Sequence, residues 1–353
     1  MRSASFLALT AAAVTSLSLL VSPTVAAQAA PTQDATAVVT AQNEATPTHV
    51  RFATFNVRTA RADIGTSRHW LQRALSVARE IDKAHPGIVA IQELGPGRAD
   101  GQKISIGKAD RQTESLLKAL SSVGAGQYKL ARTTSYVKPG TSHGTQGTRI
   151  LFDTTKYSLV SDCVETTGRS NYNGSCSMDM PIKSGDAKSA TRSAAYAEFA
   201  DRATGENFYV VSVHLDDRHS GTLSKEKALD ALRAAQAKAV YDEVSSLAGD
   251  TPILFGGDIN SWRTKAGSHA PFDYLTSKGF VDATTAAKLV DAKYPTVNHW
   301  KTTLKANAQG RQVALDVVMV KGGVSFSTYE NVMKVVNANR SSDHNMVIAD
   351  LVI

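Results

Sequence analysis

Polar side chains follow several short apolar segments, where a protein can place reactive groups beside a ligand. Asp258 and Asn260 come after the apolar run 252–255 and two glycines. Because side chains alternate with a period of two along a strand, Asp258 and Asn260 are expected to face one crevice. A carboxylate beside a carboxamide can activate a water molecule and hold a phosphate. The alternative is a glycine turn with an Asx cap.

Asn56 and Glu93 end two further apolar segments, residues 51–55 and 88–92. Loops and ligands meet a sheet at the ends of its strands. Taken alone, an Asn there is usually a turn former and a Glu is usually solvated. Oxygen donors of this kind suit a hard cation such as Mg²⁺ or Ca²⁺, and no His/Cys cluster has the spacing of a zinc site.

Two imidazoles and two more acids complete the reactive set. His214 ends the apolar run 209–213, where a histidine is often a core residue. Asp316 lies inside the apolar stretch 313–320, and an unpaired charge is so unfavourable there that it requires a partner or a metal. Asp343 and His344 bring an acid and an imidazole together before the last apolar segment.

Short apolar runs that alternate with longer amphipathic ones indicate a layered α/β domain. Strands are expected at residues 50–57, 87–92, 128–132, 148–152, 196–199, 208–215, 253–255, 313–320 and 345–352. Helices are expected at residues 68–83, 113–123 and 224–248. Their predicted apolar stripes are Trp70, Leu71, Ala74, Leu75, Ala78 and Ile81 in the first, and Leu229, Leu232, Gln236, Val240 and Leu247 in the last. Ser224 is the expected N-cap of the last helix, with Glu226 in its first turn.

The chain begins with Met1 and Arg2, an apolar run and a small-residue cleavage site, the pattern of a secretory signal peptide. A membrane anchor is the competing interpretation, but Thr, Ser and Pro residues interrupt the run. We therefore expect a signal peptide at 1–29, a flexible leader at 30–48, one catalytic domain at 49–353, and a secreted protein without stable membrane insertion.

The formal net charge is +7 over 353 residues. This mild excess suits an anionic partner such as nucleic acid or an acidic membrane, although secreted proteins also carry such charge for solubility. The two cysteines, Cys163 and Cys176, are expected to pair in an oxidising compartment, and closing this loop stabilises by about 3 kcal/mol. Two free thiols are the alternative.

In chain order, the reactive segments resemble the endonuclease/exonuclease/phosphatase superfamily, which includes deoxyribonuclease-like enzymes. The segments that carry the resemblance are 54–57, 91–93, 213–215, 257–260, 315–316 and 342–344. The resemblance implies a four-layered α/β sandwich, with two mixed β-sheets packed face to face and helices outside. It also implies hydrolysis of phosphodiester bonds by water attack.

The resemblance further implies that Glu93, with Asn56 and Asp343, binds a divalent metal that polarises the phosphate. The expected ion is Mg²⁺, with Ca²⁺ or Mn²⁺ as alternatives. Arg192 stands where relatives place an arginine that contacts phosphate.

For the acid–base groups, the resemblance implies that Asp258 activates the attacking water and Asn260 holds a phosphate oxygen. His214 and His344 flank the phosphorus, and Asp316 orients His344. Deoxyribonuclease relatives pair the first histidine with a Glu. This chain has Gln146 near that place, so a neutral partner or Asp216 remains open for His214.

Three functions compete. The leading hypothesis is a monomeric secreted nuclease that cleaves DNA or RNA. Basic residues near Asn56 and Glu93 favour it, although they suit a solvated rim equally well: Arg58, Arg61, Arg68, Arg98, Lys103, Lys108 and Arg111.

The second hypothesis is a sphingomyelinase-like enzyme acting on phospholipid headgroups or inositol phosphates. Such an enzyme is expected to have an exposed apolar feature that enters the membrane, whereas the insert 163–188 is polar. Trp262 and Trp300 suit a base or a lipid. The third, a non-catalytic binding protein, would normally show a broken site.

Overall fold

The computed structural model describes residues 46–104, 107–132, 147–163, 176–183, 192–263, 268–306, 314–333 and 340–353. The expected signal peptide, most of the leader, Gln146 and the residues between the two cysteines lie outside these ranges. Among the described residues, no helix has the length and apolar character needed to cross a membrane.

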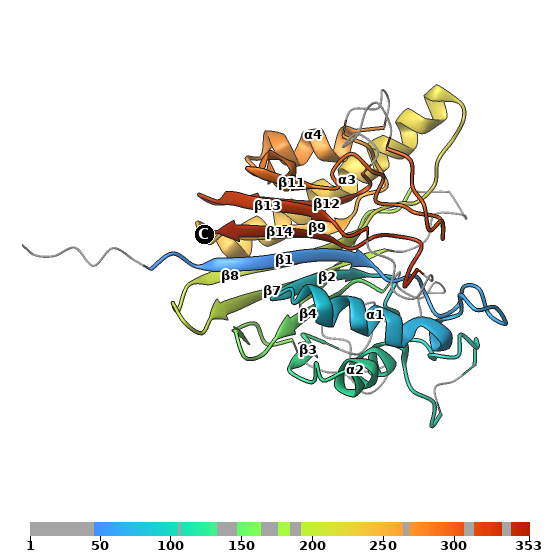
Figure 1. Ribbon diagram of the computed structural model, residues 1–353. Coiled ribbons are helices and arrows are strands. Elements are labelled where there is room, and N and C mark those ends of the chain that lie inside the picture. Colours follow the sequence, from blue (N-terminus) through green and yellow to red (C-terminus); the bar gives the residue numbers. More distant parts are fainter. Residues whose placement is uncertain are drawn as a thin grey trace, which may run out of the picture. The chain divides into compact units, whose positions relative to one another are not determined.

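The first sheet has seven strands in the order β11-β13-β14-β1-β2-β4-β3 (Figure 1). Their bounds are β1 His49–Asn56, β2 Ile88–Gln92, β3 Tyr128–Leu130, β4 Arg149–Asp153, β11 Lys288–Val290, β13 Ser325–Asn331 and β14 Val347–Val352. β1 and β2 are parallel, whereas β14 pairs with β1 and β4 pairs with β2 in the antiparallel sense. The sheet is therefore mixed.

The second sheet follows the order β10-β12-β9-β8-β7-β5, and β6 also pairs with β7. Its strands are β5 Tyr157–Leu159, β6 Ser177–Asp179, β7 Ser193–Asp201, β8 Asn207–His214, β9 Ile253–Asp258, β10 Val281–Asp282 and β12 Asp316–Lys321. β8 and β9 are parallel, and β12 runs antiparallel to β9. The strands of two parallel pairs, β1–β2 and β8–β9, therefore each end at a residue predicted from sequence to be reactive or next to one.

Apolar side chains from both sheets form the central core. Phe152 on β4 and Phe199 on β7 meet with ring centroids 5.1 Å apart, which shows that the sheets pack face to face. Helices α1 Trp70–Ala84 and α2 Gln112–Ser122 cover the outer face of the first sheet. Helices α3 Leu223–Ala248 and α4 Ala270–Ser277 cover the second. The predicted four-layered α/β sandwich is confirmed.

The buried faces of two helices differ from the predicted stripes. On α1, Leu71 and Leu75 are exposed, whereas Arg73 and Val77 are buried. On α3, Leu247 is half exposed, and the first turns bury charged residues instead. The N-cap of α3 is Thr222 rather than Ser224, because the helix begins at Leu223. Apolar periodicity therefore located these helices but missed the polar contacts that they make.

The strands absent from the sequence prediction are short or weakly apolar. They are β5, β6, β10, β11 and β13, and α4 was also missed. Five of the seven residues of β13 are Ser, Thr, Glu or Asn, and five of the seven are exposed or only partly buried. Such a segment gains its pairing from the neighbouring β14 rather than from its own hydrophobicity.

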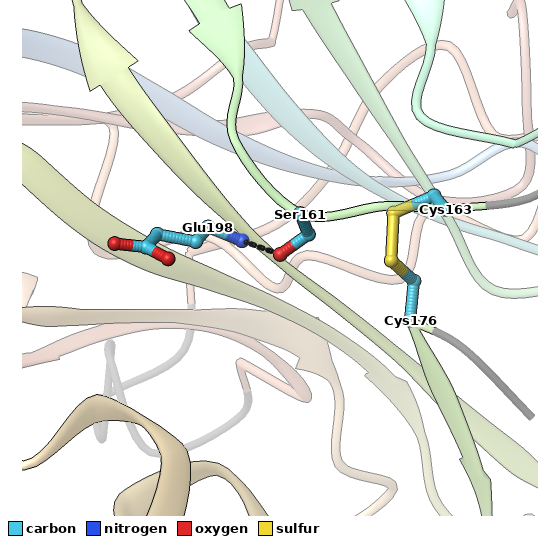
Figure 2. Close-up of a disulfide and its surroundings, with 4 residues drawn as sticks. All are labelled: Ser161, Cys163, Cys176 and Glu198. Atoms are coloured by element: carbon cyan, nitrogen blue, oxygen red, sulfur yellow. Dashed lines mark hydrogen bonds between the residues drawn. A yellow bond between two sulfur atoms is a disulfide. The ribbon is translucent and has the colours of Figure 1, made fainter.

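A disulfide joins Cys163 and Cys176, as expected, with their Cα atoms 5.3 Å apart (Figure 2). The bond connects the chain just after β5 to the chain just before β6. The Ser161 hydroxyl accepts a hydrogen bond from the backbone N–H of Glu198 at 2.8 Å beside it. Because β5 and β6 both pair with β7, the disulfide closes the connection between two strands on the same partner.

Candidate active site

Three reactive side chains lie side by side across the second sheet. Asp258 ends β9 and stands opposite His214, the last residue of β8, and Asp316, the first residue of β12. The preceding glycines permit this arrangement, because a Cβ on Gly257 would collide with Val213, and one on Gly256 would lie 2.7 Å from the Ala90 Cβ on the other sheet. The glycines thus belong to the strand and serve the close packing of protein segments.

The Asp258 carboxylate is buried and held from two sides. Its Oδ1 accepts the backbone N–H of Asn260 at 3.0 Å, and its Oδ2 accepts the Asn56 Nδ2 at 3.2 Å. The first contact is the Asx turn weighed from the sequence, and Asn260 adopts a positive φ of 48° there. Burial, followed by the charge of Asp316, raises the pKa of Asp258 to about 7. Asp258 is thus suited to exchange a proton near neutral pH.

His344 and Asp316 form a buried imidazole–carboxylate pair. His344 Nδ1 lies 3.0 Å from Asp316 Oδ2, the partner expected for this acid. Burial would lower the pKa of His344, but the Asp316 carboxylate raises it to about 10, with help from Asp258 and Asp343. The imidazole is therefore protonated at neutral pH. Its Nε2 lies 3.8 Å from Asp258 Oδ2.

His214 lies on the other side of Asp258, with its Nε2 3.6 Å from Asp258 Oδ2. Burial, then the nearby Arg192 and His344 cations, holds the pKa of His214 well below 6.5. Its Nδ1 has no hydrogen-bond partner among the described residues. Asp216 instead bonds Arg218, its Oδ2 lying 2.7 Å from the guanidinium. The two histidines beside Asp258 thus differ in charge.

Arg192 supports the end of β8 in this structure. Its buried guanidinium donates to the His214 carbonyl oxygen at 3.2 Å and lies 2.8 Å from Asp217 Oδ1. Only 1% of the side chain is exposed, so these contacts fix the backbone that carries His214. Direct contact between Arg192 and phosphate stays a prediction.

Glu93 and Asn56 meet where β1 and β2 end. Asn56 Nδ2 donates to Glu93 Oε1 at 3.1 Å, and the Thr59 backbone N–H donates to Glu93 Oε2 at 2.9 Å. Glu93 has a positive φ of 59°, a conformation that costs energy for a residue with a side chain. The backbone leaves the strand in this way so that the carboxylate turns toward Asn56.

Asp343 lies at the same edge, on the turn before β14. Its Oδ2 is 2.9 Å from the Arg58 guanidinium. Burial would lower the pKa of Arg58, but the charges of Asp343 and Glu93 raise it. The neighbouring Ser342 hydroxyl donates to the Asn56 carbonyl oxygen at 2.6 Å. These contacts bring the three predicted metal-binding residues around one region of the sheet edge.

The donor chemistry of this region fits a hard divalent cation. Glu93 and Asp343 offer carboxylate oxygens, and Arg58 is the guanidinium that offsets them. Asn56 presents its amide nitrogen to Glu93 and Asp258, while its Oδ1 accepts the Arg58 N–H at 3.0 Å. Among the described residues, the three acidic or histidine side chains whose donor atoms all lie within 4.8 Å of one another are instead Asp258, Asp316 and His344. There, however, His344 already uses Nδ1 to bind Asp316.

Behind the site, a buried charge network on α3 holds the loops that follow β8 and β9. Arg233 is fully buried and donates to Glu226 at 2.7 Å and to the Ser261 hydroxyl at 2.8 Å. Asp230 accepts the Ser261 hydroxyl at 2.7 Å and the backbone N–H of His269 at 2.8 Å. The loop that carries Asn260 is therefore anchored by buried charges in addition to the apolar packing of Ile259.

Glu226 provides a test of this network. Burial alone would raise its pKa, but hydrogen bonds from the Ser220 backbone, Ser268, His219 and Arg233 lower it to about 2. A depressed pKa adds stability that is complete above about pH 4.5 and disappears as the pH falls toward 2. We expect Glu226→Gln to lower the free energy of unfolding by about 1–3 kcal/mol at pH 7. In urea titrations the deficit should shrink below pH 4; a deficit that stays constant with pH would contradict this.

Residues 296–300 also support the site, a role that was not predicted for them from the sequence, where only Trp300 was singled out as a possible contact for a base or a lipid. Thr296 Oγ1 accepts the Asp316 backbone N–H at 3.2 Å, and the Asn298 backbone N–H donates to the Asp343 carbonyl oxygen at 2.7 Å. Trp300 packs over the Arg68 and Arg73 guanidiniums, 5.4 and 5.7 Å from its ring centroid. No apolar pattern marks such a loop, so hydrophobic periodicity does not find it.

Comparison with protein families matches residues 53–344 to the model of the endonuclease/exonuclease/phosphatase family. This range contains all of the predicted catalytic and metal-binding residues. None of the curated protein sequences matches the chain.

Solved structures share the fold at low sequence identity. An endonuclease/exonuclease/phosphatase family protein from Bacteroides thetaiotaomicron matches with a TM-score of 0.63 and 20% identity, covering 87% of this chain and 99% of its own. A mannosyl-6-phosphatase from the same species gives 0.61 and 18%, covering 86% and 100%. Zebrafish (D. rerio) TDP2, complexed with a single-strand DNA product, gives 0.54 and 14%, covering 86% and 98%. At these identities the likeness concerns the fold.

Proposed function

The chain belongs to the endonuclease/exonuclease/phosphatase family of hydrolases acting on phosphoester bonds, and from this we propose that it is a metal-dependent nuclease cleaving DNA or RNA by water attack. Metal dependence is characteristic of the family. The observation that supports the reaction is the placement of Asp258 between His214 and His344, whose imidazoles differ in charge.

In the proposed reaction, Asp258 accepts a proton from the attacking water while its contacts with Asn56 and Asn260 fix the carboxylate. The protonated His344, held by Asp316, stabilises the negative charge that develops on the phosphate oxygens. Neutral His214 donates or accepts a hydrogen bond at the phosphate, and Asn260 holds a phosphate oxygen. A proton on His344 is also available to the leaving oxygen.

Glu93 and Asp343 would hold the divalent cation, with Asn56 orienting Glu93. A bound cation neutralises charge on the phosphate and polarises it toward attack. We propose Mg²⁺ because the donors are oxygens, with Ca²⁺ or Mn²⁺ as alternatives.

Surface charge favours nucleic acid as the substrate. Four of the basic residues near the Asn56 and Glu93 ends are exposed: Arg61, Arg68, Lys103 and Lys108. The other three make ion pairs with acids, Arg58 with Asp343, Arg98 with Asp100 and Arg111 with Glu114. Four exposed cations in the segments that follow β1 and β2 suit the regularly spaced phosphates of a polynucleotide.

We also propose that the enzyme is secreted and works as a monomer. The disulfide between Cys163 and Cys176 agrees with an oxidising, extracellular location. The signal peptide and the cleavage near residue 29 remain predictions from the sequence.

A specific observation favours the lipid-directed alternative. Ile64 and Ile104 are 47% and 67% exposed, and each lies close in sequence to exposed Arg61 or Lys103. Exposed isoleucines among cations are typical of surfaces that touch anionic membranes. The polar insert therefore does not exclude an enzyme that acts on phospholipid headgroups.

The test is cleavage of supercoiled plasmid and of single-stranded RNA by the mature protein in Mg²⁺ and in excess chelator. We expect nicking or shortening that requires the metal and returns when Mg²⁺ is restored. Intact nucleic acid, together with release of phosphate from a sugar phosphate or of headgroups from sphingomyelin vesicles, would overturn the nuclease proposal and leave the phosphoesterase reaction in place.

A further inference from the structure

Two aromatic rings stand together on the rim of the site, and the reaction described above does not use them. His219 and Trp262 have ring centroids 5.0 Å apart, with their planes tilted by 54°. Trp262 follows Asn260 by two residues, and His219 follows His214 by five. Both rings therefore belong to loops that leave the strands ending at Asp258 and His214.

The charged network of α3 binds the His219 ring and, through Ser268, supports the backbone of Trp262. His219 Nδ1 lies 3.1 Å from Glu226 Oε1, and the next residue, Ser220, donates its backbone N–H to Glu226 Oε2 at 2.7 Å. The Trp262 backbone N–H donates to the Ser268 carbonyl oxygen at 2.8 Å. Because the His219 ring and the Trp262 backbone are already held, less conformational entropy is lost when a flat ligand stacks on the ring pair.

Both side chains also reach the surface. The His219 side chain is 34% exposed and Trp262 is partly exposed. Trp300, the other partly exposed tryptophan, already packs over the guanidiniums of Arg68 and Arg73. Both members of the ring pair therefore keep surface that a substrate can touch.

We propose that His219 and Trp262 form a stacking subsite for a nucleobase attached to the scissile phosphate. This inference rests on the proposed nuclease function and names the part of the nucleic acid that the site recognises. Aromatic stacking takes any base, so the subsite favours unpaired nucleotides without selecting a sequence. The enzyme should consequently prefer single-stranded or locally unpaired substrates.

Binding of two fluorescein-labelled single strands tests the subsite, one with thymine bases and one of equal length with abasic tetrahydrofuran residues. Fluorescence anisotropy in excess chelator measures affinity without turnover. Loss of one stacked base weakens binding by about 5- to 150-fold. We expect Trp262→Ala to show such a loss for the thymine strand and less than about twofold for the abasic strand. Trp262→Phe should retain most of the affinity because its ring still stacks.

Tyr196→Ala is the matched control. Tyr196 is an aromatic residue whose hydroxyl donates to Glu243 on α3. Glu243 lies 17 residues after Glu226 on this helix, so the two glutamates are about 25 Å apart along it. The Tyr196→Ala variant should bind both strands as the wild type does.

Equal losses of affinity for both strands in Trp262→Ala would overturn the subsite, even if the protein cleaves DNA. Absence of cleavage by the wild type, with base-dependent binding that Trp262→Ala removes, would overturn the nuclease proposal and keep the subsite.

Discussion

Replacing Asp258 by Asn should lower kcat/KM for phosphoester hydrolysis by at least about a thousandfold, because the variant loses the proposed base. Asn has the same shape and still offers an oxygen to the Asn260 backbone N–H, so the loop should keep its position, although the hydrogen bond from Asn56 Nδ2 is lost. The variant also removes a buried acid whose pKa is raised by burial. We therefore expect its thermal unfolding midpoint at pH 8 to equal or exceed that of the wild type.

Asp153→Asn is the control for this experiment. Asp153 is also a buried acid at the end of a strand. Because β4 runs antiparallel to β2, Asp153 lies near the start of β2, at the end of the sheet opposite to Glu93. Its Oδ1 accepts a hydrogen bond from the Thr155 backbone N–H at 2.9 Å. Asp153 has no role in the proposed reaction. Activity in Asp153→Asn should be normal. Near-normal turnover in Asp258→Asn would remove Asp258 from the role of base.

The largest expected loss of stability follows from replacing Arg233 by Met. This change leaves Glu226 and Asp230 buried without their guanidinium partner. Breaking a buried charge network in this way costs about 3–5 kcal/mol. We expect that decrease in the free energy of unfolding in urea titrations at pH 7, together with lower activity, because the Asn260 loop loses its anchor.

Lys238→Met on the same helix provides the comparison. Lys238 pairs with Asp242 at the surface, and 57% of its side chain is exposed, so its loss should change stability by less than about 1 kcal/mol. Adding Glu226→Gln to Arg233→Met should recover part of the stability, since it removes one uncompensated charge. A loss below about 1 kcal/mol in Arg233→Met would mean that loop packing, not charge, holds this region.

Much of the reactive edge was predictable because strand ends carry a strong local signal. Apolar runs that finish in Asn56, Glu93, His214 or Asp258 place those residues at strand ends, and the parallel pairs β1–β2 and β8–β9 then bring the ends together. Asp316 was predictable for a different reason. A charge inside an apolar strand requires a partner, and the partner is His344.

The supports of the site were not predictable in the same way. The inward face of α3 begins with Glu226, Asp230 and Arg233, which an apolar stripe prediction assigns to solvent. Their burial depends on the loops after β8 and β9, which are distant in sequence and have no periodicity of their own. The change in orientation at Glu93 likewise requires a left-handed backbone that its sequence neighbours do not indicate.

The pairing of β1 with β14 has a consequence for how the enzyme is made. These strands join residues 49–54 to residues 347–352 in the interior of the first sheet, and the turn before β14 carries Asp343 and His344. A ribosome synthesises β14 almost 300 residues after β1, so a nascent chain lacks one central strand and two reactive groups until synthesis has passed residue 352. The first sheet is consequently completed only after β14 has been made and has paired with β1, a strand almost 300 residues earlier in the chain.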